Sequence, residues 1–210
     1  GPMHVGHGRW AALGDATARV MAHAGYEMYQ EFYVNDHGTQ LDVFANSVSV
    51  RYQQLLGKDV EMPEKCYGGA YVKDIAQKII DEDGAKWLDV SDEERCANFK
   101  ERAYRFERDE QERVCAEFGV HFDKWFSERT LYAKDENGTS AVDRALSAMR
   151  EKGYVYEKDG AVWFRSTAFD DDKDRVLIKE NGEYTYFISD VAYHYNKIER
   201  GFDHLIDIWG

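Results

Sequence analysis

The first residues whose types and spacing could do chemistry are His4 and His7, which flank Val5 and Gly6 near the start of the chain. A glycine lacks the Cβ that would keep the backbone away from a flat base. The residues that follow have helical spacing, and the first turn of a helix offers unpaired N–H groups and partial positive charge to phosphates. The imidazoles can donate hydrogen bonds to phosphate oxygens where negative charge develops. Because His and Gly often meet by chance, the pattern alone gives only a hypothesis of a nucleotide-binding turn.

The elements that must position this turn follow it in the sequence. Apolar residues from Trp10 to Ala24 recur at steps of three and four, which predicts a helix over about 8–24 that ends before Gly25. Residues 26–34 are rich in aromatic side chains and partly alternate, which predicts a strand. A nucleotide-type turn, a helix and a strand form the second half of a right-handed βαβ unit. The strand that should precede the turn is not in the sequence, and we interpret this as a sign of truncation.

Further along the chain, the pattern predicts several helices. They are expected at about 39–56, 71–82, 91–118, 140–153 and 189–199. Ser91 and the acidic residues after it form a capping-box pattern, which is typical of the first turn of a helix.

The period changes at residue 154, where hairpins are expected. Their strands are predicted at 154–157 with 161–165 and at 175–179 with 184–188, and a buried strand is predicted at 204–209. The predicted organisation has three parts. They are the first part of a nucleotide-binding Rossmann-type domain over 1–57, an insertion of helices and hairpins over 58–183, and a return to the Rossmann-type domain over 184–210.

Composition narrows the class of protein. The chain has 210 residues, 43% hydrophobic and 32% charged, which is typical of a globular protein with a sizeable core. No apolar run approaches the roughly 20 residues that span a bilayer, and no signal peptide is visible, so we expect a cytoplasmic protein without a membrane partner. Three cysteines without a Cys-x-x-Cys pair favour a reduced chain with no metal site. The net charge of −13 argues against a surface that grips nucleic acid throughout, but not against a local basic groove or a further domain.

Three other features have more than one interpretation. Asn137-Gly138-Thr139 matches a glycosylation acceptor, and we interpret it as an Asn-Gly turn. The run Asp170-Asp171-Asp172 could bind magnesium, and a solvated acidic loop is the favoured interpretation. His194 and His204 are assigned to the surface or to packing, with no ligand role.

Five segments in order together resemble one family. The first, Gly1-Pro2-Met3-His4-Val5-Gly6-His7-Gly8-Arg9, looks like the nucleotide signature of class I aminoacyl-tRNA synthetases in its arginyl-tRNA synthetase form. The others are Tyr33 to Gln40, Phe118 to Glu128, Asp171 to Leu177 and Tyr186 to His194. The resemblance runs nearly end to end. It implies an α/β fold, namely a Rossmann-type class I synthetase catalytic domain, incomplete, with a helical and β-hairpin insertion.

The resemblance implies an ATP site at the opening signature. His4, Gly6 and His7 would bind ATP, and His4 and His7 would act catalytically by stabilising charge at the α-phosphate. His7 would also lie beside the amino acid. Mg²⁺ would come with the nucleotide, without a dedicated protein site.

The resemblance also implies an L-arginine site. Tyr186 and Asp190 fall on arginine-binding positions, and Asn35, Asp36 and Gln40 line the same region in relatives. A carboxylate suits a guanidinium, because it accepts two parallel hydrogen bonds from that planar group. At the end of a predicted strand, Asp190 would sit where ligands of open α/β sheets bind. From local sequence alone, Asp190 could instead cap the following helix, and Tyr186 could be a core aromatic.

The activity that the resemblance implies is that of an arginine–tRNA ligase. Such an enzyme activates L-arginine with ATP to arginyl adenylate and transfers it to tRNA(Arg), and DNA is not a partner. A Ser-Pro-Asn-type element, an Ala-Asp-His-His-type segment, the second ATP signature and the anticodon-binding domain are not in the sequence. We therefore expect this piece to be weakly active or inactive alone. The alternative is a non-catalytic synthetase-like nucleotide-binding or interaction protein. Relatives usually have Gly where Asp170 stands; if that Gly supplies a left-handed turn, Asp can adopt it at some cost in energy.

Overall fold

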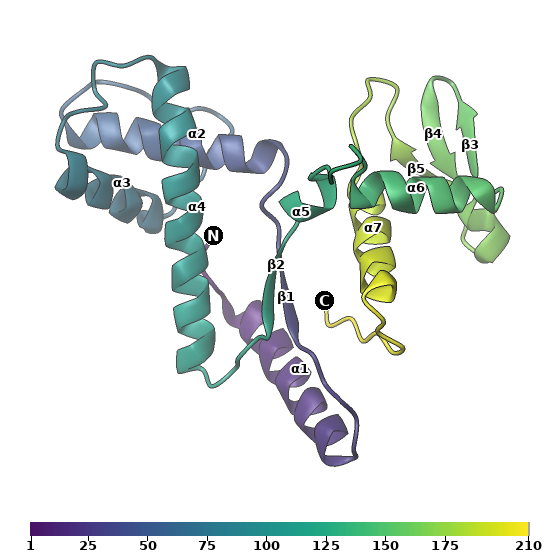
Figure 1. The fold of residues 1–210 in the computed structure, drawn as a ribbon. Helices are drawn as coiled ribbons and strands as arrows, with labels where there is room; N and C mark the ends of the chain where they lie inside the picture. The colour runs from purple at the N-terminus through teal and green to yellow at the C-terminus, as the bar shows by residue number, and fades with distance from the viewer. Residues whose placement is uncertain (210) are drawn as a thin grey trace. The chain divides into compact units, whose positions relative to one another are not determined.

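The computed structural model describes residues 1–209, which form helices and short strands in two compact units (Figure 1). The first unit contains Gly1–Phe32, Asp36–Trp125 and the residues from Ile208 onward, and the second contains Tyr33–Asn35 and Phe126–Asp207. These units are defined by packing. The predicted boundaries at residues 57 and 183 say which residues belong to the Rossmann-type domain. The packing units do not test them, so they stay a prediction.

The first unit is built from helices that begin and end close to the predicted residues. They are α1 (Val5–His23), α2 (Thr39–Leu55), α3 (Ala70–Asp83) and α4 (Asp92–Glu117). The Ser91 side chain accepts a hydrogen bond from the Glu94 N–H at 3.2 Å, so the predicted capped start of α4 is confirmed.

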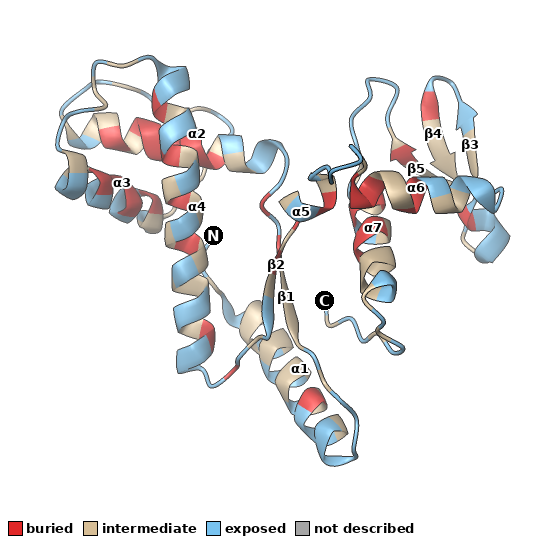
Figure 2. Cartoon of the chain, viewed as in Figure 1, coloured by how far each residue is buried: buried red, intermediate tan, exposed pale blue. Residues whose placement is uncertain are grey.

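The core of the first unit lies between α2, α3 and α4 (Figure 2). Its fully buried members include Val48, Tyr52, Val72, Ile75 and Phe99. Beside this core, the buried Arg95 donates to Ser49 Oγ at 2.8 Å and to the Trp87 carbonyl at 3.0 Å, and it pairs with Asp92. A buried guanidinium persists only when its donors are satisfied, and these partners satisfy it.

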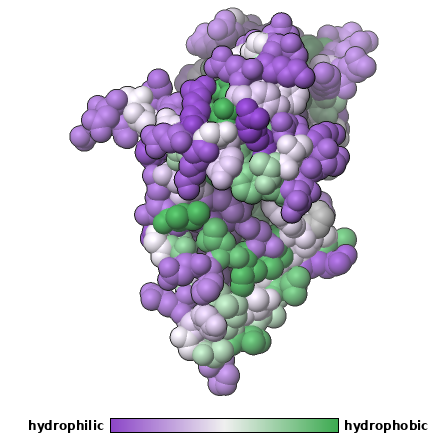
Figure 3. All heavy atoms as spheres, turned by 90° about the vertical axis from the view of Figure 1, so that its right-hand side faces the viewer, coloured by the Kyte–Doolittle hydropathy of each residue, from purple (hydrophilic) through white to green (hydrophobic). Residues whose placement is uncertain are grey.

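Helix α1 leaves several of its apolar side chains exposed. Only Ala18 is buried, while Leu13 is 58% and Val20 is 69% exposed. On the face that Figure 3 draws, hydrophobic side chains lie among hydrophilic ones. The period of an apolar stripe says which face of a helix would pack, but not whether another element covers it.

The strands β1 (Glu31–Val34) and β2 (Lys124–Ser127) pair as a two-stranded sheet. The predicted strand over 26–34 is therefore too long, because β1 covers only its last four residues. In the first unit, Phe32 stacks on Trp125 with ring centroids 4.4 Å apart, and the Lys124 N–H donates to the Gln30 carbonyl. In the second unit, the Glu128 N–H donates to the Val34 carbonyl. Because both bonds follow the same chain direction, the pair is parallel.

The second unit combines short helices with a three-stranded antiparallel sheet. Its elements are α5 (Arg129–Tyr132), α6 (Ala141–Glu151), β3 (Val155–Lys158), β4 (Ala161–Phe164), a 3₁₀ turn η1 (Ser166–Phe169), β5 (Arg175–Ile178) and α7 (Tyr186–Glu199), with sheet order β3-β4-β5. Asp159 and Gly160 both have positive φ, as the tight turn between β3 and β4 requires. The first predicted hairpin is confirmed.

The prediction of a strand over 184–188 is wrong. After β5, the chain makes one bridge between Ile178 and Tyr184, and α7 then begins at Tyr186. Aromatic and β-branched residues favour a strand locally, but Ile188, Ala192 and Tyr193 have helical spacing and are buried in one core cluster with residues of α6. This packing decides in favour of the helix.

The prediction of a buried strand over 204–209 is also wrong. Among residues 1–209 no strand pairs with this segment, and Ile206 and Trp209 are exposed. An apolar run forms a buried strand only where neighbouring strands satisfy its backbone groups.

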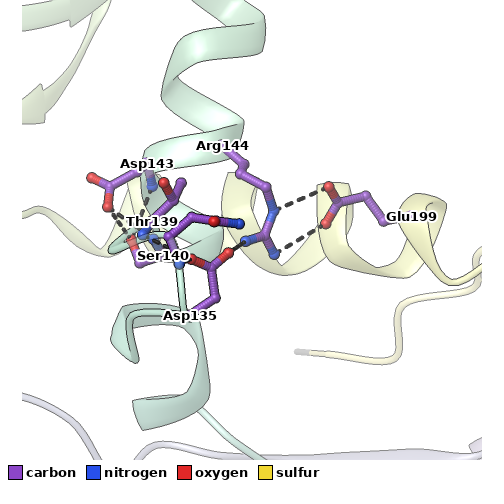
Figure 4. A network of polar contacts seen from close by, with 7 residues as sticks. Asp135, Thr139, Ser140, Asp143, Arg144 and Glu199 are labelled. Atoms are coloured by element: carbon purple, nitrogen blue, oxygen red, sulfur yellow. Dashed lines mark hydrogen bonds and ion pairs between the residues drawn. The ribbon is translucent and has the colours of Figure 1, made fainter.

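A polar network fixes the start of α6 (Figure 4). The Ser140 N–H donates to Asp143 Oδ2 at 2.9 Å and the Asp143 N–H donates to Ser140 Oγ at 3.1 Å, which is a reciprocal capping box. Arg144 pairs with Asp135 and with Glu199 on α7. The predicted Asn137-Gly138 turn is confirmed, since Gly138 has a φ of 75° and its N–H donates to the Asp135 carbonyl.

Asp170 adopts the left-handed conformation, with φ 65° and ψ 20°. We expect Asp170→Gly to raise the free energy of unfolding by up to about 1 kcal/mol, because glycine has no Cβ to strain in this conformation. Urea unfolding of the 210-residue chain measures this. The control is Asp203→Gly, at an exposed residue without positive φ, where glycine only adds unfolded-state entropy and should lower the free energy of unfolding. A lower stability for Asp170→Gly would contradict the prediction.

Candidate functional site

Two histidines cap the start of α1 reciprocally. His4 is the N-cap residue, and its Nδ1 accepts a hydrogen bond from the Gly6 N–H at 3.1 Å. His7 Nδ1 accepts from the His4 N–H at 3.2 Å. The rings stack with centroids 3.7 Å apart and planes 20° from parallel. The structure therefore brings both predicted histidines together at one helix N-terminus.

Gly6 has a packing role that the sequence did not indicate. A Cβ at this position would lie 2.9 Å from His4 Cε1 and 3.0 Å from His4 Nδ1. Such contacts are too short for a side chain, so the His4 ring needs glycine here to cap the helix.

The histidine contacts determine which nitrogen faces outward to a ligand. An Nδ1 that accepts a hydrogen bond carries no proton, so each neutral ring places its proton on Nε2. Burial lowers the pKa of His7, and the neighbouring His4 lowers it further. The first turn of α1 contains no acidic residue, so its partial positive charge is not offset locally. This helix start can donate Nε2–H hydrogen bonds to an anion.

The segment between β1 and α2 contributes three predicted residues. Asp36 is buried at 3% exposure, and Asn35 and Gln40 are exposed. Gln40 Oε1 accepts a hydrogen bond from the Tyr67 hydroxyl at 3.0 Å. Asp36 and Gln40 belong to the first unit with His4 and His7, and Asn35 to the second, so each is described within its own unit.

Tyr186 and Asp190 lie on one helix of the second unit. The predicted position of Asp190 at the end of a strand is wrong, and so is the alternative of a helix cap, because Thr185 is the N-cap of α7. Tyr186 is the first residue of α7 and is 69% exposed, so it is not a core aromatic. Four residues apart, the two side chains share one face of the helix.

The structure adds Glu128, which the sequence analysis did not single out as a site residue. Its side chain is buried at 3% exposure just after β2, and the Tyr33 hydroxyl donates a hydrogen bond to it. Both Glu128 and Asp190 act electrostatically on the hydroxyls of Tyr33 and Tyr132. In the sequence, Glu128 is a single glutamate that follows an aromatic segment, and nothing local indicates that its side chain is buried. Only the tertiary packing shows this.

Negative charge gathers around the Tyr33 hydroxyl in this carboxylate cluster. Burial raises the pKa of Tyr33 well above its usual value, and the negative charges of Glu128 and Asp190 raise it further. Loss of surrounding water raises the pKa of Asp190, Asp207 adds to the rise, and the charges of His194 and Lys197 oppose it. Two carboxylates held near the same hydroxyls favour a positively charged ligand with several donors.

The acidic loop after η1 is occupied by internal contacts. Arg175 donates to both Asp171 oxygens, at 2.7 Å from Nε and 2.6 Å from Nη2, and to Asp172 at 2.8 Å. The Arg175 hydrogen bond lowers the pKa of Asp171. Within residues 1–209, no three His, Cys, Asp or Glu side chains gather as a metal site. No helix in this range has both the length and the apolar composition that crossing a membrane requires.

The chain is similar to proteins of one family. The profile of tRNA synthetases class I (R), catalytic domain, matches residues 1–208. Two curated proteins named arginine–tRNA ligase, from Syntrophotalea carbinolica and Bacillus licheniformis, are 48% and 50% identical over 100% of this chain and 37% of their own length. A crystal structure from Campylobacter jejuni that carries the name of an arginyl-tRNA synthetase matches with a TM-score of 0.89 and 32% identity, over 100% of this chain and 45% of that one. The chain thus spans about 37% of the length of these curated relatives.

The packing of Gly6 against His4 can be tested directly. Relative to Gly8→Ala, we expect Gly6→Ala to have a free energy of unfolding lower by about 1 kcal/mol, the value of a lost cap, because the added Cβ displaces the His4 ring. Gly8→Ala is the matched control, since nothing lies within 4 Å of its added Cβ. There, alanine should gain about 0.5–1 kcal/mol from helix propensity. Denaturant unfolding measures both, and equal effects would show that the His4 cap is unimportant.

Proposed function

The chain belongs to the family of class I tRNA synthetases (R), and we propose that it forms the ATP-binding and arginine-selecting part of an arginine–tRNA ligase. In the reaction, an arginine carboxylate oxygen attacks the α-phosphorus of ATP and pyrophosphate leaves. A hydroxyl of tRNA(Arg) then attacks the arginyl carbonyl carbon of the adenylate, and AMP leaves. The observation that carries the arginine assignment is the pair of carboxylates, Glu128 and Asp190, around the Tyr33 and Tyr132 hydroxyls.

The start of α1 is the proposed ATP site. His4 and His7 would donate Nε2–H bonds to phosphate oxygens as negative charge grows at the α-phosphate. The lowered pKa of His7 favours its neutral ring, which keeps the Nδ1 lone pair for the cap and the Nε2 proton for the phosphate. Gly6 supports this by leaving room for the His4 ring. Mg²⁺ would accompany the nucleotide phosphates.

The carboxylate cluster is the proposed arginine site. Glu128 is buried and fixed, and Asp190 lies on the exposed face of α7 with Tyr186. A guanidinium has donors on both edges of one plane, so two carboxylates can bind it with directional hydrogen bonds. Asn35, Asp36, Gln40 and His7 stay candidates for contacts with the same substrate. We place the activity in the cytoplasm, where tRNA is charged.

Removing one carboxylate should impair arginine selection. In the enzyme that contains this chain at the length of its curated relatives, we expect Glu128→Gln and Asp190→Asn each to lower kcat/KM for arginine about 100-fold or more, because the guanidinium loses one of its two charged acceptors. The KM for ATP should stay within about twofold, since the α1 contacts are unchanged. Arginine-dependent ATP–pyrophosphate exchange, with and without tRNA(Arg), measures both constants.

Glu136→Gln and Asp203→Asn are matched controls, because both side chains are exposed loop carboxylates. They should leave both constants unchanged. Absence of exchange in the unmodified enzyme under both conditions would overturn the proposed function. Equal losses for arginine and ATP would show that Asp190 or Glu128 supports the fold instead.

The 210-residue chain by itself should aminoacylate tRNA(Arg) weakly or not at all. Catalysis needs ATP and arginine positioned together, and this chain spans only about 37% of its curated relatives. Charging of tRNA(Arg) with radiolabelled arginine measures this. Rates near those of the longer enzyme would contradict the expectation.

A further inference from the structure

A cluster of charged side chains lies directly behind Asp190 and takes no part in the site described above. His194 Nε2 lies 2.9 Å from Asp207 Oδ2, and Lys197 Nζ donates to Asp207 Oδ1 at 2.8 Å. His194 Nδ1 lies 2.8 Å from the backbone carbonyl oxygen of Asp190. The cluster therefore links helix α7 to the segment that follows it.

The two contacts of the His194 ring favour its doubly protonated form. A backbone carbonyl and an ionised carboxylate only accept hydrogen bonds, so His194 satisfies both neighbours only with a proton on each ring nitrogen. Partial burial opposes ionisation of Asp207, yet hydrogen bonds from Lys197 and His194 lower the pKa of Asp207 overall. Asp207 is thus a carboxylate shared by two donors.

The cluster balances charge around Asp190. On α7, His194 and Lys197 place positive charge beside it, and Asp207 from the following segment places negative charge. From β1 and α5, the neutral hydroxyls of Tyr33 and Tyr132 face the same carboxyl. Lys197 Nζ also lies 4.2 Å from the centre of the Tyr193 ring, which holds the ammonium in place.

We propose that His194, Lys197 and Asp207 form a clasp that positions Asp190 and keeps it ionised for a guanidinium ligand. This rests on the proposed arginine role of Asp190. The two cations stabilise the Asp190 carboxylate before the ligand arrives. Asp207 offsets one of these two positive charges, which weakens their repulsion of a positively charged ligand at the same place. His194 acts through Asp190 and is a positioning residue.

The clasp predicts opposite shifts for two variants of the 210-residue chain. Following the Asp190 carboxyl carbon by NMR during a pH titration, we expect the His194→Gln midpoint to move up by about half a pH unit, because a positive neighbour is lost. The Asp207→Asn midpoint should move down by a similar amount, because a negative neighbour is lost. His204→Gln is the matched control and should leave the midpoint unchanged.

The longer enzyme supplies a second readout. In His194→Gln, the acid limb of kcat/KM for arginine should shift to higher pH, since Asp190 is then protonated at higher pH. In Asp207→Asn, the KM for arginine should rise about threefold or more at neutral pH through repulsion by the uncancelled cations. The KM for ATP should change in neither variant.

The possible failures are distinguishable. Unmodified enzyme without arginine-dependent exchange would overturn the proposed function, whereas active enzyme with unshifted Asp190 midpoints in both variants would overturn the clasp alone. Shifts in the same direction for both variants would also overturn it. Removing a positive and a negative neighbour should move the Asp190 midpoint in opposite directions, whereas a general loss of helix structure would move it the same way in both. Circular dichroism of both variants confirms that α7 is retained.

Discussion

The packing of α7 in the second unit is the constraint on which the proposed arginine site depends. Ile188, Ala192 and Tyr193 are buried in one cluster with α6 residues, and this burial fixes the rotation of the helix about its axis. Tyr186, Asp190, His194 and Lys197 follow one another at steps of four, four and three, so they share a stripe outside that core. Apolar packing therefore decides where each charged group of the site lies. The ion pair between Arg144 and Glu199 adds a contact between the same two helices.

The start of α1 shows how one set of contacts can serve both folding and chemistry. An N-cap is worth about 1 kcal/mol to a helix, and Ser, Thr, Asp or Asn would supply it more simply than histidine. The His4 and His7 caps leave each Nε2 atom as the outward donor. The cost is a requirement for glycine at position 6, because the His4 ring fills the space of a Cβ. A capping role alone does not explain two stacked imidazoles, whereas an anion site does.

The sequence predicted the helices well because their signals are local. Ser91 and Ser140 cap α4 and α6, and both act through side chains within three residues. The predictions of strands over 184–188 and 204–209 were wrong, because a short apolar or aromatic run is compatible with a strand or with another conformation. Packing against residues distant in the sequence decides which one forms. The positions of His4, His7, Tyr186 and Asp190 came from motif resemblance. Glu128 was missed because its burial depends on contacts with Tyr33, far away in sequence.

Charge balance explains how an acidic chain can select one cation. With a net charge of −13, the surface attracts cations everywhere, so attraction alone gives no selectivity. Selectivity needs carboxylates that have lost water and are held in place. Glu128 is buried, and partial loss of water and the negative charge of Asp207 raise the pKa of Asp190, so a guanidinium bound to both would stabilise their ionised forms. An ammonium would relieve the charge but leave acceptor positions of the two carboxylates unsatisfied, so the arrangement favours the planar ligand.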